Sequence, residues 1–254
     1  MNDTIDYIEE VMNQSSLEAL WDLHCAKLET FGFDKIIYGY TNYRSGMSLG
    51  DVEDFFILST YDRDYLDQFI GGGLYFYGPM MKWTLENTGA QSWRLAREAY
   101  DAGELSEKQR EVFEFNRSYG LEAGYTVSFP TVSSRTKGAI SLGARENVTQ
   151  EELDALWEKC GREITLINNV AHLKIQSLPY ANPERELTNR QREVLEWVGD
   201  GKTIQDIALL IGRTPATVEK HLRLARDAMN VETTAQALLK ASFMKQIYLL
   251  EGHN

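Results

Sequence analysis

The chain has 254 residues, of which 43% are hydrophobic and 25% charged, and its 26 Lys and Arg against 38 Asp and Glu give a formal net charge of −12. That composition supports a packed core and excludes an intrinsically disordered chain. Because no apolar run approaches the ~18 residues of a membrane span and the first residues are acidic, we expect a cytoplasmic protein without a secretory signal or a membrane partner.

Helices and strands are both indicated in the first part of the chain. Ser15–Glu18 has the S-x-x-E pattern of a capping box and predicts a helix that ends near Thr30. The next expected elements are two strands rich in aromatic and β-branched residues and then two helices, at Lys35–Tyr43, Asp54–Thr60, Tyr61–Ile70 and from Pro79 onward.

The mixture of helices and strands continues to a proline-containing segment. We expect a capped helix, two strands and a long capped helix, at Ser106–Gly120, Ala123–Val132, Lys137–Ala144 and Thr149–Gln176. This order predicts an α/β/α sandwich, an antiparallel sheet flanked by helices, over residues 1–177. Pro179 and Pro183 predict a linker over residues 178–186, because proline opposes both helix and sheet.

Residues 187–254 predict a separate all-α domain of four helices. They are expected at Thr188–Gly199, at Thr203–Ile211, from Thr214 onward and at Thr234–Tyr248. Ile207, Ala208 and Leu210 should form the apolar face of the second helix, and Gly212 should make the turn that follows. A short helix, a glycine turn and a capped helix are typical of a helix-turn-helix.

The third of these helices is expected to present a cationic face. Its apolar stripe, which must face the core, directs Lys220 and Arg223 outward; the stripe is Val218, Leu222, Ala225 and Met229. In a major groove, Arg223 could bind guanine and Glu219 could accept from cytosine. Phosphate contacts are expected from Lys202, Thr203, Thr217 and Arg226.

The charge distribution is compatible with this face. Residues 186–254 carry nine Lys or Arg and nine Asp or Glu, so the net charge of −12 lies in residues 1–185. A neutral domain can still carry a local basic surface, which is what phosphate binding requires. Helical spacing alone would nevertheless favour a plain four-helix bundle with a solvated basic face.

The C-terminal sequence resembles the LuxR-type helix-turn-helix. The resemblance is continuous over residues 187–241, and its most typical parts are Leu187-Thr188-Asn189-Arg190-Gln191-Arg192-Glu193-Val194-Leu195, Gly201-Lys202-Thr203, Ile207-Ala208, Gly212, Thr217-Val218-Glu219-Lys220-His221 and Ala235-Gln236-Ala237. Gln191 stands where that family usually has Glu, and Gln serves a capping box equally. The resemblance implies binding to double-stranded DNA.

Most of residues 15–177 resembles the autoinducer-binding domain of quorum-sensing LuxR regulators. Spaced residues carry it, namely Tyr61, Tyr65, Phe69, Gly78-Pro79, Trp93, Gly124 and Ser141. The resemblance implies that Tyr61 and Ser141 bind the amide region of an acyl-homoserine lactone and that Tyr65 replaces a Trp that donates to the lactone carbonyl. It further implies ring or wall positions for Trp93, Phe69 and Pro79, and an acyl side formed by Ile37, Tyr38 and Ile57.

One departure leaves the ligand open. Gly78 stands where the family usually has an Asp that accepts the ligand amide N–H, and an unpaired buried amide costs ~1–3 kcal/mol. Three hypotheses therefore remain. The chain is a regulator gated by an acyl-homoserine lactone, or the same regulator with a non-lactone signal or none, or a metabolite-binding protein or enzyme whose helical tail does not bind DNA.

We expect a homodimer on a palindromic DNA site, with no cofactor besides the small-molecule signal. The long helix Thr149–Gln176 and the terminal helix around Leu238–Leu249 are the expected dimer contacts. Cys25, Cys160 and the four histidines have neither metal-ligand nor catalytic-triad spacing, so we expect no metal and no enzymatic activity.

Overall fold

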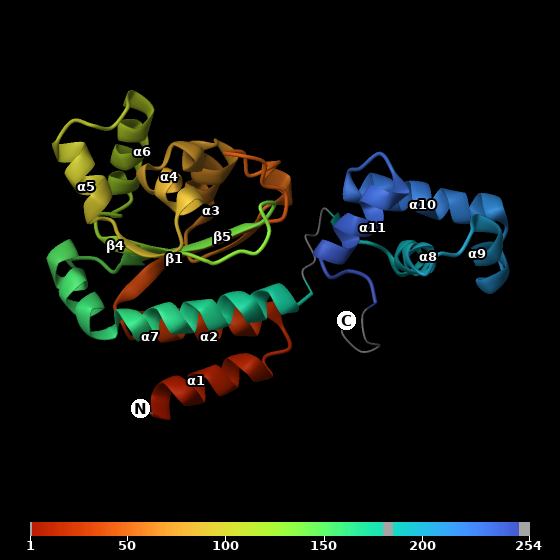
Figure 1. The fold of residues 1–254 in the computed structure, drawn as a ribbon, viewed down its shortest axis with the longest axis horizontal. Coiled ribbons are helices and arrows are strands. Elements are labelled where there is room, and N and C mark those ends of the chain that lie inside the picture. Colours follow the sequence, from red (N-terminus) through yellow and green to blue (C-terminus); the bar gives the residue numbers. More distant parts are fainter. Residues whose placement is uncertain (1, 180–184, 249–254) are drawn as a thin grey trace. The chain divides into compact units, whose positions relative to one another are not determined.

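The computed structural model describes residues 2–179 and 185–248 and divides the chain into two compact units, Met1–Gln176 and Ser177–Asn254 (Figure 1). Most of the predicted linker, residues 178–186, lies outside the described residues, because 180–184 are not described. Within the described ranges, no helix is long and apolar enough to cross a membrane.

The first unit is built on a five-stranded antiparallel sheet. Its strands lie in the order β2-β1-β5-β4-β3, and their bounds are Phe33–Thr41 for β1, Phe56–Ser59 for β2, Gly89–Ser92 for β3, Gly124–Ser128 for β4 and Lys137–Ala144 for β5. Every neighbouring pair is antiparallel, and β1 pairs with β5 over its full length, from Phe33 opposite Ala144 to Thr41 opposite Lys137. The predicted antiparallel sheet is confirmed.

Helices cover both faces of this sheet (Figure 1). On one face lie α2 and α7, with α1 on their outer side; the bounds are Asn2–Asn13 for α1, Leu17–Glu29 for α2 and Gln150–Ser177 for α7. The other face carries α3 at Arg63–Leu66, a π-helical turn at Asp67–Gly71, α4 at Pro79–Glu86, α5 at Arg94–Asp101 and α6 at Glu107–Ser118. This arrangement is the expected three-layer sandwich.

The second unit contains the helix-turn-helix. Its helices are α8 at Asn189–Gly199, α9 at Ile204–Leu210, α10 at Pro215–Met229 and α11 at Thr234–Phe243. Capping boxes open three of them, at Thr188, Thr203 and Thr233, because each threonine accepts from a backbone N–H three residues on. The buried stripe of α10 packs into the core with Val194 and Leu195 of α8 and Ile207 of α9.

Some boundaries and faces differ from the expectations. α1, β3 and α5 were not predicted, and α11 ends at Phe243 rather than Tyr248. The turn after α11 explains its earlier end, since Lys245 takes a positive φ of 53°. Leu210 was expected on the buried face of α9, yet it is 54% exposed, and only Ile207 and Ala208 of that face are buried.

Candidate ligand cavity and nucleic-acid interface

A cavity of about 200 Å³ lies in the first unit and is walled by strands β1, β2, β4 and β5 and by the helices α3–α6. Nine of the ten residues predicted to bind a ligand line it, namely Ile37, Ile57, Tyr61, Tyr65, Phe69, Gly78, Pro79, Trp93 and Ser141. Residues that lie between 37 and 141 in the sequence are thus brought around one space. Most of its wall is aliphatic and aromatic, which is typical of a small-molecule site.

Tyr38 is the exception, and the prediction that it lies on the acyl side is wrong. Its side chain is 1% exposed and points to the opposite face of β1, where its hydroxyl bonds Nδ1 of His172 on α7 at 2.8 Å. Neighbouring side chains of a strand face opposite sides. Its two neighbours Ile37 and Gly39 line the cavity, whereas Tyr38 packs against His172 of α7.

An aromatic stack forms one wall. The rings of Tyr61 and Tyr65 stack with centroids 4.3 Å apart, and Tyr65 continues onto Phe69 at 5.1 Å and Phe115 at 5.4 Å. The Tyr65 hydroxyl donates to Oδ1 of Asn116 at 3.0 Å, on α6. Burial raises the pKa of the Tyr61 and Tyr65 hydroxyls above their usual value, so both remain protonated donors at neutral pH.

Trp93 lines the cavity beside Ser141. Its Nε1–H donates to Oγ1 of Thr126 at 2.9 Å, and Thr126 lies opposite Ser141 in the pairing of β4 with β5. Gly124 makes room for the ring, because a Cβ there would lie 2.7 Å from Cε3 and Cζ3 of Trp93. The hydroxyls of Ser141 and Thr126, 3.5 Å apart, form a polar part of the cavity wall.

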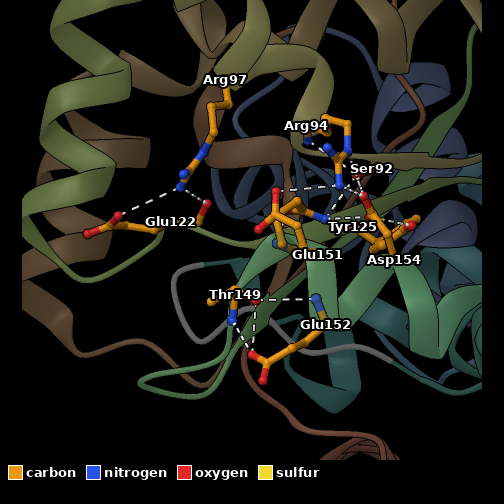
Figure 2. A network of polar contacts seen from close by, with 11 residues as sticks. Ser92, Arg94, Arg97, Glu122, Tyr125, Thr149, Glu151, Glu152 and Asp154 are labelled. Carbon is orange, nitrogen blue, oxygen red and sulfur yellow. Dashed lines mark hydrogen bonds and ion pairs between the residues drawn. The ribbon is translucent and has the colours of Figure 1, made fainter. Parts of the chain in front are cut away.

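A polar network holds the segment around Trp93 against α7 (Figure 2). Oδ1 of Asp154 accepts from Ser92 at 2.9 Å and Tyr125 at 2.7 Å, while Oδ2 accepts from Nε of Arg94 at 2.7 Å. Gln150 joins them, donating to Oδ1 of Asp154 at 2.8 Å. Because Ser92 and Arg94 flank Trp93, this network fixes the tryptophan relative to the long helix.

Gly78 has ordinary backbone geometry. Its φ of −56° and ψ of 133° are open to any residue, so no conformational demand requires glycine. A Cβ at this position would meet the carbonyl oxygen of Tyr75 at 3.2 Å, a contact that needs a shift of a few tenths of an ångström. The position therefore offers a ligand no side-chain acceptor, and an aspartate could be built there with a small adjustment.

Lys137 and Glu122 are the two charged residues among the described residues that line the cavity. Glu122 is exposed and forms ion pairs with Arg97 at 3.7 Å and Arg117 at 3.8 Å. Lys137 is 5% exposed, and its ammonium donates to the carbonyl of Asn87 at 3.0 Å. Burial lowers the pKa of Lys137, and the nearby positive charge of Arg44 lowers it further.

Sequence reasoning missed several cavity residues. Lys137 and Ala139 alternate with Ser141 along β5, so the period of two that identifies one face of a strand could have found them. Thr126 could have been found only from the register of β4 with β5. Asn116 and Phe113 of α6 carry no comparable signal, because their place depends on how α6 packs.

The outer face of α10 has the predicted arrangement. Glu219, Lys220 and Arg223 are exposed, while Val218 and Leu222 behind them are 0% and 5% exposed. Arg223 forms an ion pair with Asp227 at 3.1 Å, and both side chains are 59% exposed, so the pair can open at little cost. The surface of this helix is therefore available to a partner.

The residues predicted to contact phosphates differ in their exposure and in the hydrogen bonds that they already form within the protein. Lys202 and Thr203 are exposed at the start of α9, where Thr203 caps the helix and donates to Asp206 at 2.7 Å. Thr217 is half-buried and shares a hydrogen bond with Thr214 at 2.9 Å. Arg226 is half-buried and donates to Oγ1 of Thr234 at 3.1 Å, which ties α10 to α11.

Known families match both units. Residues 16–175 match the family model of the autoinducer binding domain, and residues 185–229 match that of sigma-70 region 4. The transcriptional activator AnoR of Acinetobacter nosocomialis is 26% identical over 54% of this chain but only 57% of its own length. The transcriptional activator LuxR of Aliivibrio fischeri is 24% identical over 81% of this chain and 77% of its own.

Two solved structures share the fold. SdiA of Escherichia coli superposes with a TM-score of 0.51 at 15% identity and covers 98% of this chain and 99% of its own. The N-acylhomoserine lactone dependent LuxR family transcription factor CepR2 of Burkholderia cenocepacia gives a TM-score of 0.52 at 15% identity over 68% of this chain and 94% of its own. At this identity the likeness concerns the fold alone.

Proposed function

The chain belongs to the LuxR family of quorum-sensing regulators, with an autoinducer-binding domain and a helix-turn-helix, and from this premise we propose that it is a transcription regulator whose DNA binding responds to a small molecule held in the cavity. The observation that carries the proposal is the pairing, in one chain, of an apolar cavity with an exposed cationic helix. DNA binding points to the cytoplasm as its location.

Helix α10 is the proposed recognition helix. Arg223 and Lys220 lie on its solvent-exposed side. Val218, Leu222 and Ala225 on the opposite side pack into the core, an arrangement in which a helix can present side chains to base edges. Arg223 would donate to guanine and Glu219 would accept from cytosine. Lys202, Thr203, Thr217 and Arg226 are proposed phosphate contacts, of which Lys202 is the most accessible cation.

Selection from a pool of random DNA duplexes tests the DNA-binding part. We expect the full-length protein to enrich a consensus with two symmetric half-sites about one helical turn apart, ~34–36 Å. The variant Arg223→Ala should enrich no such consensus. Arg190→Ala is the matched control, because Arg190 of α8 also forms an exposed ion pair, with Glu193, and is not assigned to DNA. Equal enrichment by the Arg223 variant would refute the assignment of α10.

The cavity is the proposed signal site. Ser141, Thr126 and Tyr61 would bind the polar head of a ligand, and Ile37, Ile57 and Phe69 would surround its apolar part. An acyl-homoserine lactone is one candidate. A non-lactone signal is the second, favoured by Gly78, which supplies no acceptor for a ligand amide, and by Tyr65, whose hydroxyl already bonds Asn116.

Thermal melting with a panel of acyl-homoserine lactones separates these two candidates. A ligand that binds only the folded state raises the melting temperature, by an amount that grows with its concentration over Kd. A shift with one acyl length supports the lactone. If no lactone shifts the melt, while small molecules that co-purify with the protein are found by mass spectrometry, the non-lactone signal is supported.

We further propose a homodimer on a palindromic site. On α7, Leu166 and Leu173 are 47% and 66% exposed and lie two helical turns apart on one face. On α11, Leu239 is 54% exposed. Large exposed apolar side chains on one helix face are typical of an interaction surface. Association of two copies would place two recognition helices on the two halves of a symmetric site.

The competing hypothesis is a metabolite-binding protein or enzyme that does not bind DNA. The relatives named above are transcription regulators, and the described residues hold no cluster of three or more His, Cys, Asp or Glu suited to a metal ion. We propose that the chain is not an enzyme and uses no cofactor beyond its signal. Turnover of any compound extracted from the purified protein would support the competing hypothesis instead.

A further inference from the structure

Lys137 places a buried positive charge in the wall of a cavity that is otherwise mostly apolar. Its side chain lines the cavity and is 5% exposed, and in the described residues no carboxylate forms an ion pair with it. Burial lowers the pKa of Lys137, and the guanidinium of Arg44, whose charge has the same sign, lowers it further. A buried ammonium with no counter-charge is costly, and proteins retain such groups mainly at functional sites.

The hydrogen bonding of Lys137 is only partly satisfied by the protein. An ammonium has three donors, and one of them reaches the carbonyl of Asn87, at the C-terminal end of α4, at 3.0 Å. That carbonyl also accepts from Oγ of Ser128 at 2.7 Å. A helix C-terminus offers only about half an elementary charge, so it offsets the ammonium incompletely.

The position of Lys137 in the sheet separates it from the Ser141 part of the cavity. Ser141 lies beside Thr126 and Trp93, and Lys137 lies four residues away from it on the same face of β5. At a rise of about 3.3 Å per residue, the two Cα atoms are about 13 Å apart. A ligand that spans the cavity would have one end at Ser141 and the other at the ammonium.

We propose that the signal molecule is bifunctional: its head binds at Ser141 and Trp93, and its far end carries an ionised acidic group, such as a carboxylate, that pairs with Lys137. The inference rests on the proposed ligand-sensing function and specifies the chemical class of the ligand. A methyl-terminated acyl chain would leave the ammonium buried and unpaired, whereas a carboxylate would supply the missing counter-charge and accept the remaining N–H donors.

Ligand extraction tests the proposal on whichever compound the protein binds in the cell. The full-length protein, Lys137→Met and Lys35→Met are produced in the source organism, and bound compounds are released and analysed by negative-ion mass spectrometry. Methionine keeps most of the length of the side chain and removes its charge. Lys35 is the matched control because it lies exposed on the adjacent strand β1. We expect an acidic compound bound to the native protein and to Lys35→Met and lost from Lys137→Met.

Two results separate this inference from the proposed function. A neutral compound bound equally to all three proteins contradicts the proposal that the ligand ends in an acidic group. It leaves the proposed ligand-sensing function intact. No bound compound in any of them, together with no shift in melting by any probe, overturns both.

A second arm needs no variant, so it remains decisive if Lys137→Met does not fold. Two synthetic lactones of equal chain length, one ending in a methyl group and one in a carboxylate, are compared by melting of the native protein. We expect the carboxylate probe to bind more tightly, on the order of 30-fold, as for a buried charge pair. A methyl-terminated probe that stabilises the native protein as well or better contradicts the proposal.

Discussion

His24 is buried among α1, α2 and α7, and its burial favours the neutral ring. Nδ1 of His24 accepts from the hydroxyl of Tyr7 at 2.6 Å, and Nε2 then donates to Oδ1 of Asn168 at 3.1 Å. His172 is similarly enclosed, between the hydroxyl of Tyr38 and the side-chain amide of Gln176. Burial lowers the pKa of each histidine to about 4.

These two histidines predict acid sensitivity of the first unit. Since their folded pKa lies below the unfolded value of 6.5, the unfolded chain binds more protons, and the free energy of unfolding decreases as the pH falls from about 6.5 to about 4. The full loss is about 3 kcal/mol per histidine. Urea denaturation at several pH values between 7 and 5 measures this slope. We expect His24→Gln to flatten this slope. A slope in the His24 variant equal to that of the native protein would show that His24 is not its cause.

Gly78 is the residue at which the lactone hypothesis can be tested most simply. We expect Gly78→Asp to fold, since its φ of −56° suits any residue and, in the part of the chain that the structure describes, a Cβ there would closely approach only the carbonyl of Tyr75. If the cavity otherwise binds lactones, the new acceptor should tighten binding by ~10–100-fold, the counterpart of a buried N–H that gains its partner. Melting with the lactone panel measures it. A smaller shift than in the native protein would mean that the cavity no longer suits lactones.

Individual residues show what sequence reasoning can and cannot place. Nine of the ten residues predicted from spacing typical of the family line the cavity, because the fold fixes these positions. Tyr38 was misplaced although it lies next to Ile37, since a strand sends neighbouring side chains to opposite faces. Lys137 was overlooked because a lysine in a strand is ordinarily exposed, and its burial depends on Asn87 at the end of α4.

At the scale of elements, the junction between β3 and α5 depends on Asp154. Its carboxylate accepts from Ser92, Tyr125 and Gln150 and pairs with Arg94 at 2.6 Å (Figure 2). We expect Asp154→Ala to lower the free energy of unfolding by ~1–3 kcal/mol, because several partly buried donors lose their acceptor. It should also change the fluorescence of Trp93, which the network holds.

Glu151→Ala is the control for this change. Glu151 reaches the same Arg94 at 3.6 Å, but its side chain is 70% exposed, so its loss should cost under about 1 kcal/mol. Urea denaturation of both variants provides the comparison. A loss of stability that is no greater for Asp154→Ala than for Glu151→Ala would show that the network does not hold this junction.

The elements that sequence reasoning missed lack local signals. β3 is Gly89-Ala90-Gln91-Ser92, without a β-branched or aromatic residue. It forms a strand because its backbone pairs with β4. α1 is strongly acidic, and it is held by Tyr7 and Val11, which are 4% and 0% exposed. Long, capped elements such as α7 and α10 were predicted well, because their caps and apolar stripes can be recognised from local sequence patterns.

At the scale of the whole molecule, function is proposed to require two copies. We expect the full-length protein to be a dimer and Leu173→Glu to weaken its association, because the variant places a charge on the exposed apolar face of α7. Sedimentation equilibrium measures the change. Leu95→Glu on α5, where leucine is 43% exposed, is the control and should dissociate no more than the native protein. Unaltered association of the Leu173 variant would exclude this face.

The signal and the DNA are proposed to be linked through the folded sensor. A ligand that binds one state of the sensor more tightly shifts the population of the state that binds DNA, and DNA must then change ligand affinity by the same factor. The network from Trp93 to α7 offers a physical connection between the cavity and the proposed dimer helix. Activation and repression both fit this linkage.

Fluorescence anisotropy with a duplex carrying the selected consensus tests most directly whether α10 reads DNA. We expect Arg223→Ala to weaken binding by roughly 10–100-fold, matching ~1–3 kcal/mol for a bidentate contact, while Arg190→Ala binds as the native protein does. Equal affinity of the native protein and Arg223→Ala for that duplex, or equal affinity of the native protein for a scrambled duplex, would contradict the assignment of α10 as the recognition helix.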